Sequence, residues 1–130
     1  MPDAGDAVVR VVDGDTVVLR AAGTSRLIGV DTPEVFGRRG CFGEAASDFA
    51  KRTLRPGLRV RVEGDAQPRD RYGRRLVYLS LPDGRSFNEL LVREGFAVAL
   101  TIAPNVRYAG RFRELAGRAR ERRAGLWSAC

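Results

Sequence analysis

The chain is 130 residues long, and its 44% hydrophobic and 30% charged residues are ordinary usage for a single globular domain spanning residues 1–130. It contains no histidine, which excludes Ser-His-Asp and Cys-His catalysis, and no apolar run approaches the ~20 residues that cross a bilayer. The net charge of +7, carried by arginine at every basic position except Lys51, favours a polyanionic partner, but charge that serves only solubility gives the same composition.

The first third of the chain is predicted to form three short strands in succession. These strands are Ala7–Val12, Thr16–Ala21 and Ser25–Val30. They are separated by the turn-forming sequences Asp13-Gly14-Asp15 and Ala22-Gly23-Thr24, so the three strands make a meander. Pro33 then breaks the pattern, because proline cannot donate to a strand ladder, and residues 35–43 are predicted to form a loop.

Two further strands and three helices follow. The strands are Leu58–Glu63, where apolar and charged residues alternate, and Leu76–Leu81. The helices are Glu44–Leu54, a segment that begins at the capping box Ser86-Phe87-Asn88-Glu89, and Val106–Arg123. Five short strands interrupted by helices predict an α+β fold, a five-stranded antiparallel β-barrel of the OB type with three α-helices packed on it. Such barrels bind oligonucleotides on an open face.

Several carboxylates are candidates for holding a metal ion. Because the chain has two cysteines and no histidine, we expect oxygen ligands and therefore calcium, magnesium or manganese. Asp13 and Asp15 flank a glycine and can direct oxygens at one cation, although Asp-Gly is also the commonest hairpin turn. Asp31 and Glu34 lie on a proline corner, where one can ligate a cation while the other activates a water. An ordinary turn with a capping aspartate explains that corner equally well.

Two arginines near these carboxylates are candidates for binding phosphate. Arg26 precedes Asp31 by five residues, so a regular strand would place their side chains on opposite faces, unless a bulge near Gly29 re-aims one of them. Arg74 ends a charged loop at the point where a predicted strand begins, and that strand would hold a phosphate clamp in place. Side chains that face solvent are the simpler explanation for both arginines.

Taken together, these motifs resemble the thermonuclease family typified by staphylococcal nuclease. The ordered set consists of Asp13–Thr16, Arg26–Glu34, Asp70–Arg74, Asn88–Gly95 and the terminal Gly125–Ser128. The resemblance covers about residues 8–128, with matching spacing. It implies an OB-type barrel with three helices, and calcium-dependent (Ca2+) hydrolysis of phosphodiester bonds in DNA and RNA that leaves 3′-phosphates.

The resemblance also implies roles for individual residues. The implied calcium site consists of the carboxylates of Asp15 and Asp31, the backbone carbonyl of Thr32 and, in support, Asp13. The implied catalytic residues are Glu34, as general base or water-orienting group, and Arg26 and Arg74, which grip the scissile phosphate. Arg71 and Tyr72 correspond to contacts with a terminal phosphate, and Arg38 and Arg39 are expected to contact the DNA backbone.

Two further features of the sequence bear on the expected function. Leu100 and Ile102 stand where the family has tyrosines beside the bound nucleotide, so we expect weaker nucleotide affinity or an altered base preference. Cys41 and Cys130 occur in an order found in many extracellular-looking relatives, which implies one disulfide; two free thiols in a cytosolic protein are the alternative.

The sequence therefore predicts a monomeric, secreted or periplasmic endonuclease with DNA and RNA as substrates and no membrane partner. The first residues lack the apolar stretch of a signal peptide, so the predicted location rests on the resemblance and on the cysteines. A non-catalytic OB module that binds nucleic acid is the alternative, but such modules lose the acidic residues that remain here as Asp15, Asp31 and Glu34. A phosphodiesterase for small nucleotides is a third interpretation, which only the missing tyrosines favour.

Overall fold

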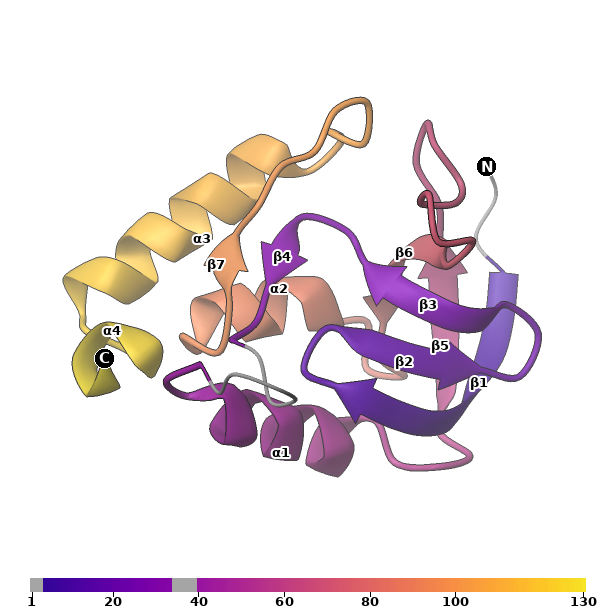
Figure 1. Ribbon diagram of the computed structural model, residues 1–130, viewed down its shortest axis with the longest axis horizontal. Helices are drawn as coiled ribbons and strands as arrows, with labels where there is room; N and C mark the ends of the chain where they lie inside the picture. Colours follow the sequence, from indigo (N-terminus) through magenta and orange to yellow (C-terminus); the bar gives the residue numbers. More distant parts are fainter. Residues whose placement is uncertain (1–3, 34–39) are drawn as a thin grey trace.

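The structure, a computed structural model, describes residues 4–33 and 40–130. Its strands are β1 (Ala4–Asp13), β2 (Thr16–Leu19), β3 (Gly23–Leu27), β4 (Val30–Asp31), β5 (Arg59–Glu63), β6 (Arg75–Ser80) and β7 (Val98–Ala99) (Figure 1). Its helices are α1 (Gly43–Thr53), α2 (Phe87–Arg93), α3 (Ala109–Glu121) and α4 (Leu126–Ala129). Within the described ranges, no helix has the length and apolar character needed to cross a membrane.

Five strands close into a barrel in the order β1-β2-β3-β6-β5, which confirms the predicted α+β architecture of OB type. The meander of β1, β2 and β3 is antiparallel, as are β1 with β5 and β5 with β6. The β3–β6 pair runs parallel, with Arg26 opposite Leu76, so the barrel is mixed and not wholly antiparallel. A parallel pair needs a crossover connection, and here the chain between β3 and β6 supplies it through α1 and β5.

The third predicted strand, Ser25–Val30, is divided in two. The chain turns at Gly29, where φ is 82°, and β4 then pairs with β7 instead of continuing in the barrel. A Cβ atom on Gly29 would lie 2.2 Å from the ring of Phe112, so only glycine fits between the turn and α3. This turn carries Asp31 away from the barrel wall.

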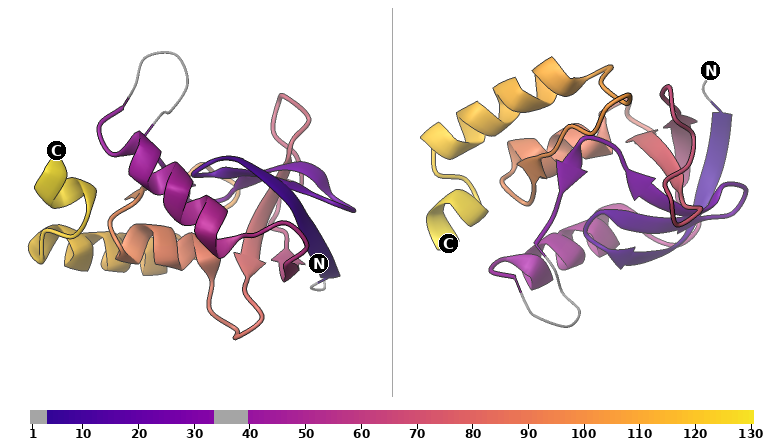
Figure 2. Two further views of the ribbon diagram at one scale, coloured as in Figure 1. Left: turned by 90° about the horizontal axis from the view of Figure 1, so that it is seen from below. Right: turned by 45° about the horizontal axis from the view of Figure 1, so that its top comes forward.

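Buried apolar residues of the barrel and of α2 share one core. Examples are Val17, Leu19, Val77 and Leu79 in the strands, and Phe87 and Leu91 in α2. The views in Figures 1 and 2 place α2 between α3 and the barrel. Helix α2 begins as predicted, because the Ser86 hydroxyl accepts a hydrogen bond from the Glu89 amide.

Asn88 is a fully buried polar side chain at the junction of α2 with the barrel. Its Oδ1 accepts a hydrogen bond from the Leu79 amide, and its Nδ2 donates to the carbonyls of Ile28 and Val77. A single side chain thus joins α2 to β6 and to the turn that follows β3. Its hydrogen-bonding groups are satisfied, which a buried amide requires.

The predicted helix Val106–Arg123 is shorter at both ends, and an unpredicted fourth helix follows it. Helix α3 ends at Glu121, after which Arg123 and Gly125 adopt φ values of 58° and 52°. These two turns reverse the chain and start α4, whose Leu126 amide donates to the carbonyl of Gly95 at 2.8 Å. Helix α4 is thereby docked on the segment that follows α2.

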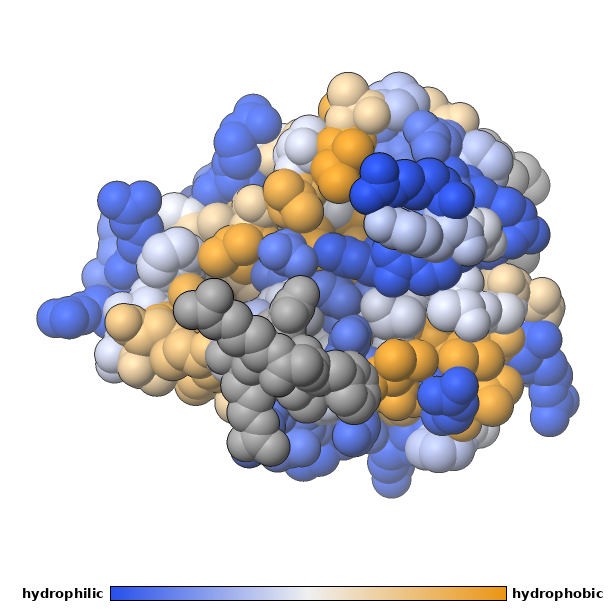
Figure 3. Space-filling view, viewed as in Figure 1, coloured by the Kyte–Doolittle hydropathy of each residue, from blue (hydrophilic) through white to orange (hydrophobic). Residues whose placement is uncertain are grey.

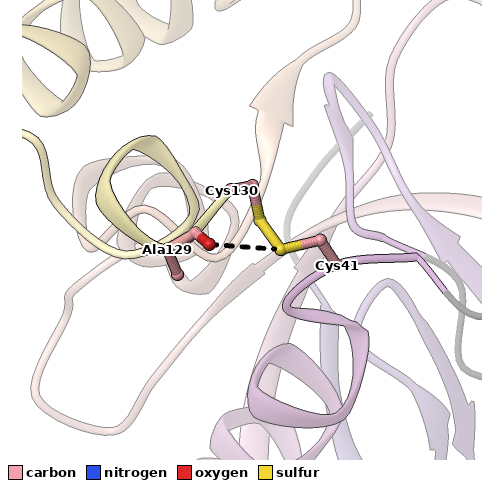
Figure 4. The surroundings of a disulfide bond; sticks show 3 residues. All are labelled: Cys41, Ala129 and Cys130. Carbon is pink, nitrogen blue, oxygen red and sulfur yellow. Dashed lines mark hydrogen bonds between the residues drawn. A yellow bond between two sulfur atoms is a disulfide. The ribbon is translucent and has the colours of Figure 1, made fainter.

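A disulfide joins Cys41, just before α1, to Cys130 at the end of α4. The two Cα atoms are 6.0 Å apart, and the cysteines are separated by 89 positions in the sequence. The Ala129 carbonyl oxygen lies 3.6 Å from Cys41 Sγ (Figure 4). The pairing implied by the resemblance is present in the structure, and the alternative of two free thiols is not.

Candidate functional site

Two acidic segments that are distant in sequence meet beside the barrel. The Thr32 amide donates to Asp15 Oδ2 at 3.0 Å, which joins the β1–β2 turn to the segment after β4. A Cβ atom on Gly14 would lie 2.8 Å from the side chain of Thr32, so the glycine lets the turn lie directly against it. Asp15 and Thr32 are both buried. We call Asp13, Asp15, Asp31 and Thr32 the acidic corner.

The carboxylates of the β1–β2 turn repel one another. Burial, and next to it the neighbouring Asp15 carboxylate, raise the pKa of Asp13 to about 6. A positive charge beside this pair would relieve the repulsion. The acidic corner therefore favours a bound cation electrostatically.

Arg26 supplies positive charge to this corner from within the chain. Its Nη2 lies 3.4 Å from Asp15 Oδ2 and 3.3 Å from Asp31 Oδ1. Its Nη1 donates to the carbonyls of Leu27 and Val30 at 2.7 and 2.9 Å. The side chain is only 16% exposed, so the solvent-facing interpretation is wrong.

Arg26 and Asp31 lie on the same side in spite of their odd spacing. A regular strand would place them on opposite faces, and the structure replaces that strand with the turn at Gly29. The sequence suggested that a bulge near Gly29 could redirect one of the two side chains. In the structure, the turn at Gly29 and the pairing of β4 with β7 have this effect.

The second arginine is held in the loop before β6. Arg74 Nε donates to Asp70 Oδ2 at 2.7 Å. Burial opposes ionisation of Asp70, but its hydrogen bonds from Arg74, and then from the Tyr72 amide, lower its pKa below the ordinary value. The guanidinium groups of Arg71 and Arg74 lie 5.0 and 5.5 Å from the centre of the Tyr72 ring.

Arg26 and Arg74 line one cavity of about 460 Å³. Its walls include Arg71, Tyr72, Leu100 and Ile102. Hydrophobic and strongly hydrophilic surfaces adjoin over the loops in this part of the molecule (Figure 3). The cavity can thus accept an anionic group at the arginines and an apolar group beside Leu100 and Ile102.

Asp31 and Thr32 line a smaller cavity of about 240 Å³, together with Cys41 and Cys130. The acidic corner meets the larger cavity through Arg26, which contacts both Asp15 and Asp31. Among residues 4–33 and 40–130, no three Asp, Glu, Cys or His side chains are grouped so as to hold a metal ion. The available donors are carboxylate and carbonyl oxygens, which suit a hard cation whose remaining ligands are water.

Part of the predicted site lies outside the described residues. Glu34, Arg38 and Arg39 belong to this part. The structure brings together the other arginines and the acidic residues, and it adds Asp70, to which the sequence assigned no role. The spacing of four residues between Asp70 and Arg74, within a turn-forming sequence, is the signal that could have found it.

Comparison with known proteins gives concordant matches. Residues 24–129 match the sequence model of a family described as staphylococcal nuclease homologue. Thermonucleases of Staphylococcus hyicus and Staphylococcus intermedius are 41% and 40% identical to the chain, over 93% and 92% of it and 74% of each relative. Endonuclease YncB of Bacillus subtilis (strain 168) is 37% identical over 92% of the chain and 59% of the relative.

Proposed function

The chain belongs to the staphylococcal nuclease family, and from this premise we propose that it is a calcium-dependent endonuclease of DNA and RNA that leaves 3′-phosphates. Membership and the endonuclease names of the relatives make the chain a nuclease, a hydrolase of phosphodiester bonds. The dependence on calcium, the products and the roles of single residues are the proposal. The observation that carries it is the pair Arg26 and Arg74 in one cavity, with acidic residues against Arg26.

The two arginines are proposed to bind the scissile phosphate. A phosphodiester has one negative charge, and its pentacovalent transition state has more. Two guanidinium groups placed in one cavity can stabilise this increase with hydrogen bonds and positive charge. Arg71 and Tyr72, which line the same cavity, are proposed to bind a neighbouring phosphate.

The acidic corner is proposed to hold the calcium ion. Its ligands would be the carboxylates of Asp15 and Asp31 and the carbonyl of Thr32, with Asp13 in support. When bound, the ion adds positive charge beside the phosphoryl oxygens. With so few protein ligands, we expect modest affinity.

Glu34 is proposed to act on the attacking water, either by accepting its proton at a carboxylate oxygen or by orienting it. The leaving group is the 5′ oxygen. Arg38 and Arg39, in the same segment, are proposed to contact the nucleic-acid backbone. The disulfide supports a secreted or periplasmic location, because such bonds persist in oxidising compartments, and we propose that the protein acts there as a monomer.

Cleavage assays with calcium or chelator test the proposal. Plasmid and single-stranded DNA are expected to be degraded with calcium and to stay intact when chelator is present. Glu34→Gln is expected to lower cleavage at least 100-fold, because general base catalysis contributes about 10²–10⁴-fold. Glu114→Gln is the control, since this carboxylate is exposed and pairs with Arg118 on α3. Binding without cleavage at any calcium concentration would instead identify a non-catalytic module.

The aliphatic wall of the cavity leads to a separate prediction. Leu100 and Ile102 are 39% and 66% exposed, so larger rings at these positions have room. Because stacking on an aromatic side chain stabilises each base by about 1–3 kcal/mol, Leu100→Tyr with Ile102→Tyr is expected to tighten binding of a single-stranded oligonucleotide at least fivefold.

Fluorescence anisotropy without cleavage, in chelator, measures this affinity. Val106→Tyr is the control, because Val106 is 49% exposed and lies outside the lining of both cavities. Equally tight binding by the Val106→Tyr variant would mean that any added surface ring binds the oligonucleotide. The prediction that the cavity wall at Leu100 and Ile102 contacts the bases would then be wrong.

A further inference from the structure

Asp70 contacts residues of the cavity of about 460 Å³ that Arg26 and Arg74 line, which we call the arginine cavity. Its carboxylate is 17% exposed and accepts three hydrogen bonds. Oδ1 accepts from the amides of Tyr72 and Arg74 at 2.9 and 3.0 Å, and Oδ2 accepts from Arg74 Nε at 2.7 Å. One side chain therefore fixes both the backbone of the loop and the guanidinium group that the loop presents.

The geometry of the Arg74 contact matters for phosphate binding. Asp70 accepts the hydrogen bond of Arg74 Nε. Arg74 Nη1 and Nη2 can then donate two parallel hydrogen bonds to a phosphate. An arginine on a loop tip would otherwise sample many rotamers. Misplacement of a catalytic group by about 1 Å can cost 100-fold in rate, so a fixed guanidinium has a large kinetic effect.

We propose that Asp70 is a positioning residue of the nuclease, which holds Arg74 in the orientation that stabilises the transition state. The inference rests on the proposed function. The negative charge of Asp70 by itself repels a phosphate, so its benefit must come from orientation. Its loss is therefore expected to lower kcat while leaving KM unchanged or lower.

The chain contains a matched control for this contact. In the loop between β6 and α2, Asp83 accepts from the Arg85 amide at 3.0 Å and from Arg85 Nε at 2.8 Å. These are the same two contacts that Asp70 makes with Arg74. Neither Asp83 nor Arg85 lines the arginine cavity, so Asp83→Asn removes an ion pair with the same two contacts, in a more exposed place away from the site.

The test compares kcat and KM for a single-stranded oligonucleotide with calcium present. Asp70→Asn is expected to lower kcat about 10–100-fold with KM within threefold of the wild type, and Asp83→Asn to leave both unchanged. When Arg74→Ala is already present, Asp70→Asn should lower kcat no further, because the effect is transmitted through Arg74.

Two results would overturn the inference. One is a kcat for Asp70→Asn within twofold of the wild type. The other is a decrease in kcat on Asp70→Asn that is equally large in the wild type and in the Arg74→Ala variant. Thermal melting shows whether each variant is folded. If Asp70→Asn is not, Asp70→Ser takes its place, since a serine hydroxyl can still accept from the loop amides but cannot reach Arg74. A wild-type protein that cleaves nothing would refute the proposed function instead.

Discussion

Arg74→Lys is expected to lower kcat by about 10²–10³-fold while the protein stays folded. Lysine keeps the charge but offers a point charge in place of a planar fork with several fixed donors. It cannot contact Asp70 and grip a phosphate through two parallel hydrogen bonds at once. Loss of one placed donor to a transition-state oxyanion typically costs this factor.

Steady-state cleavage of an oligonucleotide at saturating calcium measures this effect. Arg85→Lys is the control, because Arg85 makes the corresponding contacts with Asp83 outside the cavity. The side chain of Arg74 is 31% exposed, so the melting temperature should change by no more than a few degrees. A variant with nearly normal kcat would show that charge alone suffices at this position.

Reduction of the disulfide is expected to lower the free energy of unfolding by about 4–5 kcal/mol. Cys41 and Cys130 are 89 positions apart, so their bond closes most of the chain into one loop and restricts the unfolded state strongly. Urea denaturation with and without a phosphine reductant measures the difference. Without reductant, alkylation should add no label.

The double variant Cys41→Ser, Cys130→Ser provides the matching comparison. It should unfold at the same urea concentration as the reduced wild type and be insensitive to reductant. Ser128→Ala, an exposed position on α4, controls for changes in that helix itself. Identical midpoints for oxidised and reduced wild type would show that restriction of the unfolded state by this bond adds no stability, and the prediction would be wrong.

The barrel could be predicted because its strands have local signatures. In β5, the buried Val60 and Val62 alternate with the exposed Arg59 and Arg61, as the alternation of the sequence predicts. The short β4–β7 pair and the four-residue helix α4 have no such signature. Their positions depend on tertiary contacts, such as the Leu126 amide with the Gly95 carbonyl, which no local pattern encodes.

The composition of the candidate site could be anticipated, but its geometry could not. The absence of histidine and the spacing of acidic residues indicated oxygen ligands, and the resemblance supplied the roles. The contact between Arg26 and Asp31 depends on a turn at Gly29 packed beneath Phe112, which lies more than eighty residues further along the chain. A strand pattern alone places these two side chains apart.

The buried amide of Asn88 has a consequence for how uniquely the chain folds. A leucine of similar size would fill the same space, but it would tolerate α2 sliding along the barrel. The Asn88 amide makes all its hydrogen bonds only when Leu79, Val77 and Ile28 are all in place. If α2 shifted along the barrel, polar groups would be left without hydrogen-bond partners in an apolar interior. Asn88 therefore selects one alignment of helix and barrel, and with it the position of the turn that delivers Asp31 to Arg26.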